Sequence, residues 1–449
     1  MRDFAAVILA AGAGTRMKSS LPKVMHKLSG KPLINWVIDA VEALKPDKIV
    51  VIFGHKSEIV QENFKNKKVT IAYQEQQLGS AHALMQAQKA LRYYKGDLLV
   101  ICGDVPLVKV SELSSLIKYN KKNKSSVTVL AARVDNPCGY GRIVKNGDAL
   151  EKIVEEKDAD ECEKLINEVN SGIYCFDNNV WKALSKVKPD NAKKEYYLTD
   201  TVEILKKLGK KTMFITAKNA SELRGINNRR ELQEAENALQ RVKIDELFKK
   251  GITIIDVNNI YVSYDAEIGQ DTVIYPGVFI DVGVKIGKNC IIQGSSYIKN
   301  SSIADNVSIL SSYINGSKIG NGSKIGPFSH IRSESILKDG VKIGNFSETK
   351  KAVISKNSKV NHLSYIGDAE VGENVNIGAG TITCNYDGKN KHRTVIGSGS
   401  FVGSNVNFVA PVKIGKDALI AAGSTITNDI PSGRLAIARA RQELKYRKK

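Results

Sequence analysis

An aliphatic residue recurs at every sixth position through much of the C-terminal half of the chain. This period fits neither an α-helix nor an ordinary strand, and it predicts a parallel β-helix built from hexapeptides. In such a solenoid each hexapeptide contributes one short strand, and three of them close a triangular coil. The aliphatic side chains should point inward and stack on their equivalents in neighbouring coils. The repeating positions are Ile268, Ile274, Ile280, Ile286, Ile292 and Ile298, then Ile319, Ile325, Ile331, Leu337 and Ile343, and later Ile396, Val402, Phe408, Ile414, Ile420 and Ile426.

Glycine and small residues accompany this repeat at constant offsets. We expect the glycines that follow the inward residue to form tight corners with φ > 0, where glycine is unstrained. These glycines are Gly269, Gly287, Gly320, Gly326, Gly344, Gly397, Gly403 and Gly415, and the small residues four positions on include Thr272, Cys290, Ser323, Ser329, Ser400 and Ser424. The register breaks between Thr383 and Ile396. We therefore expect residues 384–391 to leave the coil as a loop, and loops on rigid scaffolds often carry function.

The N-terminal half alternates short apolar runs with amphipathic stretches such as Leu33–Leu44 and Ala81–Leu91. Buried strands separated by helices predict a mostly parallel, Rossmann-like α/β sheet, whose ligands bind at the carboxyl ends of the strands. Residues 229–250 predict one connecting helix that Gly251 ends, with Leu232, Ala235, Leu239 and Val242 on a shared face. The predicted strands are Ala6–Leu9, Ile49–Phe53, Val69–Ala72, Leu98–Ile101, Val127–Ala131, Ile173–Phe176 and Met213–Ile215.

These patterns predict an α/β domain at 1–228, a helical linker at 229–250 and a β-helix domain at 251–449 that ends in a basic tail. Two domains suit a chain of 449 residues, because single hydrophobic cores stop growing near ~250–300 residues. The apolar segment Phe4–Ala11 runs directly into a glycine-rich stretch, so we expect a buried first strand rather than a signal peptide. No apolar stretch approaches the ~20 residues of a membrane span, and the six cysteines form no CxxC pair. Reduced thiols in the cytoplasm are therefore expected.

The formal net charge of +20 raises the question of nucleic acid binding. Lysine and arginine are spread over the whole chain, without a motif that reads bases. We therefore expect no nucleic acid partner, and we expect anionic small substrates, above all phosphates, to benefit from the positive field.

The segment Leu9–Met17 follows the first predicted strand directly and contains two glycines and Arg16. Small residues let backbone N–H groups approach a phosphate or a base edge, and Arg16 adds positive charge. The segment lacks the third glycine of the dinucleotide fingerprint, so NAD is not expected. Lys23 is placed to neutralise a phosphate oxygen. Asp104 follows the Leu98–Ile101 run at a carboxyl end suited to Mg²⁺, although a turn-forming aspartate is the alternative.

Together these motifs resemble a known family. Leu9–Met17, Leu21–Lys23, Tyr73–Gln74 with Gln77–Ala81, and Gly103–Pro106 look like a sugar-1-phosphate nucleotidyltransferase. Joined to a hexapeptide solenoid that carries Asn385–Gly388, they resemble the bifunctional N-acetylglucosamine-1-phosphate uridyltransferase/glucosamine-1-phosphate acetyltransferase family over nearly the whole chain. The resemblance implies a left-handed parallel β-helix, a cytoplasmic homotrimer, Mg²⁺, and the co-substrates UTP and acetyl-CoA. The implied product is UDP-N-acetylglucosamine, a precursor for peptidoglycan and lipopolysaccharide.

For uridylyl transfer, the resemblance implies a set of ligand contacts. Leu9, Ala10, Ala11, Gly12, Gln74, Gly79 and Ser80 would hold the uridine, Arg16 and Lys23 would offset the phosphate charge, Gly103 would belong to the same nucleotide site, Gly141, Glu155, Asn170 and Asn227 would contact the sugar or diphosphate, and Asp104 and Asn227 would bind Mg²⁺. Relatives usually carry Lys at Ala13 and Thr at Ser80, and neither change removes an obligatory ligand. The sugar phosphate is already an anionic nucleophile, so the site must supply alignment and charge cancellation rather than a base.

Acetyl transfer needs a base, because the amine of glucosamine is largely protonated near neutrality. His362 is the candidate, since it stands two places past the inward Val360 and should face outward, although a surface histidine is the plain alternative. Tyr365, Asn376 and Asn385 are expected nearby as hydrogen-bond partners. The resemblance places Arg332, Lys350, Tyr365 and Asn376 on glucosamine 1-phosphate, and Ala379, Asn385, Tyr386, Ser404, Ala422 and Arg439 on acetyl-CoA. The Ala379 N–H is a candidate for the oxyanion. Around Arg332 the chain departs from the Leu-Arg-Pro pattern of relatives.

Two other interpretations stay open. In one, the solenoid only oligomerises or regulates a nucleotidyltransferase, as in proteins similar to ADP-glucose pyrophosphorylase, but a passive scaffold needs neither His362 nor Lys350. In the other, the solenoid is a non-enzymatic binding or structural module, and the complete α/β half with Asp104 argues against it.

Overall fold

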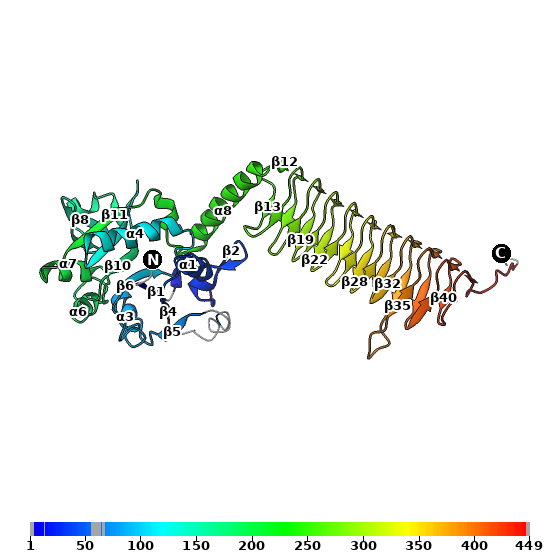
Figure 1. Cartoon of the computed structure of the whole chain (residues 1–449), viewed down its shortest axis with the longest axis horizontal. Coiled ribbons are helices and arrows are strands. Elements are labelled where there is room, and N and C mark those ends of the chain that lie inside the picture. Colours follow the sequence, from blue (N-terminus) through cyan, green and yellow to red (C-terminus); the bar gives the residue numbers. More distant parts are fainter. Residues whose placement is uncertain (1–3, 13, 55–63, 65–67, 446–449) are drawn as a thin grey trace. The chain divides into compact units, whose positions relative to one another are not determined.

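The computed structural model describes residues 4–12, 14–54, 64 and 68–445 of the chain. The chain divides into two compact units, Met1–Glu236 and Asn237–Lys449, and the division falls inside the long helix α8 (Arg229–Lys249) (Figure 1). Among the described residues, no helix is both long and apolar enough to cross a membrane.

A nine-stranded sheet forms the centre of the first unit, in the order β5-β4-β1-β6-β10-β7-β11-β9-β8. Every predicted strand is present, and β5-β4-β1-β6 and β7-β11 are parallel, whereas β10 runs antiparallel to both its main neighbours. The prediction missed the antiparallel hairpin of β8 and β9. The strands are β1 (Phe4–Ala10), β4 (Lys48–Phe53), β5 (Thr70–Tyr73), β6 (Asp97–Cys102), β7 (Val127–Arg133), β8 (Arg142–Asn146), β9 (Ala149–Val154), β10 (Glu168–Phe176) and β11 (Thr212–Thr216), and a separate pair joins β2 (Lys27–Leu28) and β3 (Lys31–Pro32).

Helices cover both faces of this sheet. Ala6 and Ile8 of β1 pack into one apolar cluster with α1 and α4, whereas Ala5 and Val7 pack into another with α3, α6 and α7. Burial on both faces explains why the strands are continuous apolar runs rather than alternating ones. The helices are η1 (Thr15–Met17), η2 (Lys23–Met25), α1 (Leu33–Glu42), α3 (Ser80–Met85), α4 (Val110–Asn123), α5 (Glu161–Lys164), α6 (Val180–Leu184), α7 (Asp200–Lys207) and η3 (Ala220–Leu223).

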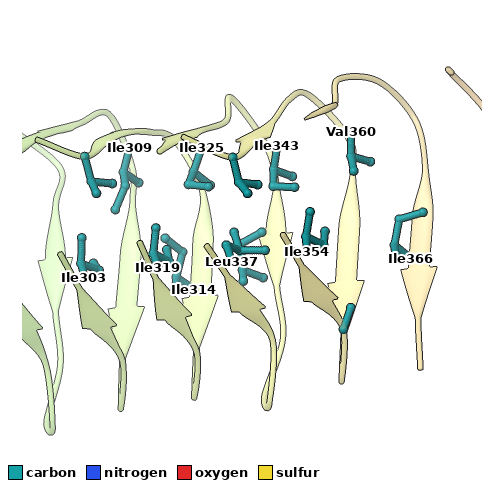
Figure 2. Packing of buried hydrophobic residues seen from close by; sticks show 14 of the residues in the cluster. Ile303, Ile309, Ile314, Ile319, Ile325, Leu337, Ile343, Ile354, Val360 and Ile366 are labelled. Atoms are coloured by element: carbon teal, nitrogen blue, oxygen red, sulfur yellow. The ribbon is translucent and has the colours of Figure 1, made fainter. Parts of the chain in front are cut away.

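The second unit is a parallel β-helix, which runs from β12 (Thr253–Ile254) to β41 (Leu435–Ala436). Its strands form three parallel sheets of 11, 10 and 9 strands, and each strand pairs with an equivalent one coil later. Ile268 pairs with Ile286, and Ile274 with Ile292, so the repeating aliphatic residues stack as predicted. Figure 2 shows these side chains in rows inside the solenoid, among them Ile303, Ile319 and Leu337.

The glycines after the inward residues serve a purpose other than the predicted one. Of that predicted set, only Gly326 has a positive φ. At Gly269 an added Cβ would lie 2.6 Å from the carbonyl carbon of Gly287, and at Gly403 it would lie 2.5 Å from the nitrogen of Ala422. The prediction of left-handed corners at these glycines is therefore wrong, because close approach of the next coil, not φ, excludes a side chain.

The second half of α8 packs against the first coils of the solenoid. Of the predicted face, Ala235 of the first unit and Leu239 of the second are buried, but Val242 is 57% exposed. Lys243 is buried in its place, because its ammonium donates to the carbonyls of Tyr264 at 3.0 Å and Ala266 at 2.6 Å. A pattern of apolar residues cannot predict a buried lysine whose ammonium is hydrogen-bonded to backbone carbonyls.

Candidate active sites

A cavity of about 330 Å³ opens at the carboxyl ends of the parallel strands β1 and β6. Strand-end loops build it, as expected for an open α/β sheet. The Gly103 N–H donates to the Leu9 carbonyl at 2.8 Å, and Gln77, which the sequence placed in a family motif without a role of its own, donates to the Ala11 carbonyl at 2.6 Å. Predicted residues that line the cavity are Leu9, Ala10, Ala11, Gly12, Lys23, Gln74, Gly79, Ser80 and Asp104.

One departure from the family pattern, Ser80, lies at this site. The Ser80 hydroxyl accepts a hydrogen bond of 3.0 Å from the Leu198 N–H, a bond that the threonine of relatives would also accept. Ala13 lies outside the described residues.

Arg16, Lys23, Asp104 and Asn227 meet at one point, although Arg16 and Asn227 are 211 residues apart. The Lys23 ammonium forms an ion pair with Asp104 and donates to Asn227 Oδ1 at 3.1 Å, and Arg16 donates to the same oxygen at 3.0 Å. The Ile226 N–H donates to the Asp104 carbonyl at 2.9 Å, which ties the segment of Asn227 to the loop of Asp104. The cluster therefore combines oxygen ligands with positive charge.

The oxygens of this cluster suit Mg²⁺. Asp104 and Asn227 already share one cation, the Lys23 ammonium. Mg²⁺ is usually held by one or two protein carboxylates together with phosphate oxygens and water. In the described part of the chain, no group of three or more His, Cys, Asp and Glu side chains is arranged to hold a metal. Mg²⁺ bound here would thus depend on substrate phosphates as further ligands.

Gly141, Glu155 and Asn170 form an adjoining group. The Asn170 N–H donates to the Gly141 carbonyl at 2.8 Å, and a Cβ on Gly141 would lie 3.4 Å from Glu155 Oε1. Burial raises the pKa of the Glu155 carboxyl, to which the Thr199 hydroxyl donates at 3.3 Å. The charge of Glu195, which lines the cavity, raises the pKa of Glu155 further.

On the solenoid, His362 has a polar partner in the preceding coil. Its Nδ1 lies 2.7 Å from Oδ1 of Asn345. Because an amide oxygen only accepts, Nδ1 carries the proton and Nε2 keeps its lone pair, which is the tautomer that a general base requires. Sequence reasoning missed Asn345 and suggested Tyr365, Asn376 and Asn385, none of which bonds to His362 within the described chain. The available signal for Asn345 in the sequence was its spacing of 17 residues, about one coil, from His362.

Three of the four predicted sugar-phosphate residues share a face. Arg332 follows β25 (His330–Ile331), Lys350 ends β28 (Glu348–Lys350) and Tyr365 begins β31 (Tyr365–Gly367), which are neighbours in the ten-stranded sheet. Glu348, which sequence reasoning missed, accepts a hydrogen bond of 2.7 Å from Arg332. Asn376 lies on β33 (Asn376–Ile377) in the eleven-stranded sheet. A single chain therefore does not bring Asn376 onto the face of the other three.

The predicted acetyl-CoA residues Ala379, Ser404 and Ala422 form a column that continues from His362. Val360 pairs with Ile377, and Ile377 with Val402, so these positions are equivalent in successive coils. The Asn405 N–H donates to the Ala379 carbonyl at 2.7 Å, and the Gly423 N–H to the Ser404 carbonyl at 2.8 Å. Arg439 donates to the Ala422 carbonyl at 2.6 Å and thereby joins the column.

The insert leaves the coil between β34 (Ile382–Cys384) and β35 (Thr394–Ile396) as a hairpin (Figure 1). Tyr386 and Lys391 pair across it, and Asp387 Oδ1 accepts the Lys389 and Asn390 N–H groups at 2.8 and 2.7 Å. These backbone hydrogen bonds, led by that of Asn390 and assisted by His392, hold the pKa of Asp387 far below its usual range. The insert is thus an ordered hairpin.

Lys391 of this hairpin, another residue that sequence reasoning missed, lies beside Lys350. The Lys391 ammonium, then desolvation and then the Arg332 charge lower the pKa of Lys350, and the Asp368 carboxylate opposes this effect. Three cations that repel one another form a natural site for a phosphate.

These observations define a class of protein: a two-part transferase with a nucleotidyltransferase-type α/β sheet, followed by a left-handed hexapeptide β-helix. Comparison with family models agrees: the nucleotidyl transferase family matches residues 5–223, the GMPPB C-terminal domain matches 257–347, and the bacterial transferase hexapeptide (six repeats) matches 393–428.

Similarity extends to whole proteins. The chain is 49% identical to the "Bifunctional protein GlmU" of Halalkalibacterium halodurans, over 97% of this chain and 96% of that protein. It is 47% identical to proteins of the same name from Listeria welshimeri, over 98% of this chain, and from Shouchella clausii, over 97% of this chain, in both cases over 96% of the relative. The chain belongs to the GlmU family of bifunctional transferases.

Proposed function

We propose that this chain acetylates glucosamine 1-phosphate with acetyl-CoA and transfers UMP from UTP to N-acetylglucosamine 1-phosphate, which yields UDP-N-acetylglucosamine and diphosphate. The observation that carries the proposal is the presence of two chemically different groups in one chain. One is a cluster suited to phosphates and Mg²⁺, formed by Arg16, Lys23, Asp104 and Asn227. The other is the imidazole of His362, whose Nε2 keeps its lone pair.

Uridylyl transfer requires alignment and charge cancellation. The attacking sugar phosphate is an anion, so the protein supplies no base. Arg16 and Lys23 would hold the triphosphate in line with the sugar phosphate, and Gly141, Glu155 and Asn170 would bind the sugar hydroxyls. Asp104 and Asn227 would hold Mg²⁺, which when bound supplies positive charge against the phosphates.

Acetyl transfer requires a base and an oriented amine. Asn345 keeps His362 in the tautomer whose Nε2 accepts the proton of the glucosamine ammonium, and the freed amine attacks the thioester carbonyl. Arg332, Lys350 and Lys391 would hold the sugar phosphate. Ala379 continues the column of His362, and its N–H donates no hydrogen bond to another described residue, which supports its role toward the oxyanion.

We also propose that the protein acts as a homotrimer. Asn376 lies on a different sheet from Arg332, Lys350 and Tyr365, so a complete sugar site needs the Asn376 face of a neighbouring copy. A triangular solenoid offers flat faces on which copies can pack around a threefold axis.

Two single substitutions in the full-length chain test the proposal. We expect His362→Ala to lower acetyl transfer by at least about 100-fold, the contribution of a general base, and to leave uridylyl transfer unchanged. Asp104→Ala should do the reverse, and EDTA should abolish uridylyl transfer alone. The measurements are CoA release from acetyl-CoA with glucosamine 1-phosphate and diphosphate release from UTP with N-acetylglucosamine 1-phosphate. Equal loss of both activities in either variant would show damage to folding rather than to a site.

A further inference from the structure

Gln74 is a polar side chain of the first cavity whose orientation is determined within the protein. It follows β5, is 3% exposed, and lines the cavity together with Gly79 and Ser80. Its amide nitrogen donates to the Gly79 carbonyl at 3.0 Å, and a carbonyl oxygen can only accept. The amide nitrogen therefore faces Gly79, and Oε1 faces away.

The Gly79 carbonyl is a rigid partner. The Ala81 N–H donates to the Tyr196 carbonyl at 2.9 Å, and the Tyr196 N–H donates to the Leu78 carbonyl at 2.8 Å. A Cβ on Gly79, where φ is 116°, would lie 2.5 Å from the Tyr196 oxygen, so the two backbones meet without room for a side chain. The backbone around Tyr196 therefore holds the Gly79 carbonyl, which orients Gln74, in a fixed position.

His82 accepts the second proton of the same amide. Its Nδ1 lies 3.0 Å from Gln74 Nε2, and this contact is a hydrogen bond only if Nδ1 is unprotonated. A neutral imidazole accepts at one nitrogen, so Nε2 carries the ring proton. The Gln86 amide nitrogen lies 3.3 Å from Nε2 and also donates to the His82 carbonyl at 3.0 Å, so we assign the acceptor to Nδ1 because its contact with Gln74 is the shorter of the two ring contacts.

Both side-chain N–H groups of Gln74 have acceptors, the Gly79 carbonyl and His82 Nδ1, so its Oε1 remains available to a ligand. Among the described residues Oε1 accepts no hydrogen bond, and it is not one of the buried polar atoms sealed without a partner, so it opens to the cavity. An acceptor here suits a pyrimidine that carries an N3–H, such as uracil. It opposes cytosine, whose N3 carries a lone pair instead.

We propose that His82 is a positioning residue that locks the Gln74 amide and thereby selects a pyrimidine nucleotide with an N3–H donor. The inference rests on the proposed uridylyl transfer. His82 is not among the described residues that line the cavity, so it acts through Gln74 and not on the substrate. Without the Nδ1 acceptor, the Gly79 carbonyl is the one remaining partner of the amide among the described residues, so a turned amide that offers its N–H to cytosine becomes less unfavourable.

Two variants of the full-length protein separate this role from a structural one. In His82→Asn the amide oxygen replaces Nδ1 as acceptor, whereas His82→Leu supplies none. The measurement is kcat/KM for UTP and for CTP with N-acetylglucosamine 1-phosphate and Mg²⁺, and acetyl transfer serves as the folding control. We expect His82→Asn to keep the UTP:CTP ratio of the unmodified protein and His82→Leu to lower it at least about tenfold.

An unchanged ratio in an active His82→Leu protein would overturn the inference and leave uridylyl transfer standing. An unmodified protein that transfers no nucleotide at all would instead overturn the proposed function. The imidazole ¹⁵N shifts of His82 in the unmodified chain give a readout that does not depend on any variant folding. We expect a protonated Nε2 and an unprotonated, hydrogen-bonded Nδ1, and a proton on Nδ1 would overturn the inference.

Discussion

At the scale of single residues, the carboxyl group of Asp200 in the α/β unit is destabilising when it is ionised. Burial, and after it the charge of Glu155, raises the pKa of Asp200 from its ordinary 3.8 to about 6. Because the folded state binds the proton more tightly than the unfolded chain, folding takes up a proton between these two values. The free energy of unfolding therefore falls as pH rises through that window, and the ionised group stays destabilising above it.

Asp200→Asn should stabilise the α/β unit. We expect the free energy of unfolding to rise by about 1 kcal/mol near pH 7.5, less than the full pKa shift suggests, because the group is partly exposed and lies in the first turn of α7. The gain should be clearly smaller near pH 4.5. Urea unfolding of the full-length chain at both pH values measures it, with the exposed Asp190→Asn as control. A gain that does not vary with pH would contradict the electrostatic explanation.

Among the elements, the β-helix depends on glycine for two separate reasons. Gly269, after β14 (Glu267–Ile268), lacks space for a Cβ because Gly287 of the next coil lies against it. Gly322 has a φ of 64° and no atom within 4 Å of a Cβ position. Packing constrains the first glycine, and backbone conformation constrains the second.

Gly269→Ala should therefore destabilise the solenoid more than Gly322→Ala does. We expect a loss of about 2–3 kcal/mol for the first, since backbone must move, and about 1 kcal/mol for the second, the usual penalty for an alanine at positive φ. Urea unfolding of the full-length variants, followed by circular dichroism, measures both. Equal losses would mean that close approach of the coils is not the dominant constraint.

For the whole molecule, the two units carry separate chemistry and should work when separated. A cut between Glu236 and Asn237 keeps Lys243 with the carbonyls of Tyr264 and Ala266 that it binds, whereas a cut near Gly251 would remove it. We expect residues 1–236 to make UDP-N-acetylglucosamine with Mg²⁺, and residues 237–449 to acetylate glucosamine 1-phosphate. Rate assays and sedimentation of each piece, which should show a trimer for 237–449, provide the test. A folded, trimeric 237–449 without acetyl transfer would favour a purely regulatory solenoid.

The sequence by itself determined which residues would be inside. The six-residue spacing of Ile268, Ile274 and Ile280 determines a coil, because a hexapeptide solenoid buries a side chain at that interval and neither a helix nor an ordinary strand does. The first strand was equally predictable, since an apolar run such as Phe4–Ala10 is typical of a strand buried on both faces. The family motifs likewise selected the residues that line the first cavity.

Only the tertiary structure decided which polar groups meet. Arg16 and Asn227 are 211 residues apart in the sequence, so no local spacing reports their contact. The one-coil spacing of Asn345 and His362 places the two residues in neighbouring coils, but it does not show that their side chains bond. The tautomer of His362 and the separation of Asn376 from Arg332 follow from such long-range contacts. The physical reason is that hydrophobic periodicity is written along the chain, whereas a hydrogen bond depends on two side chains that folding brings to within about 3 Å.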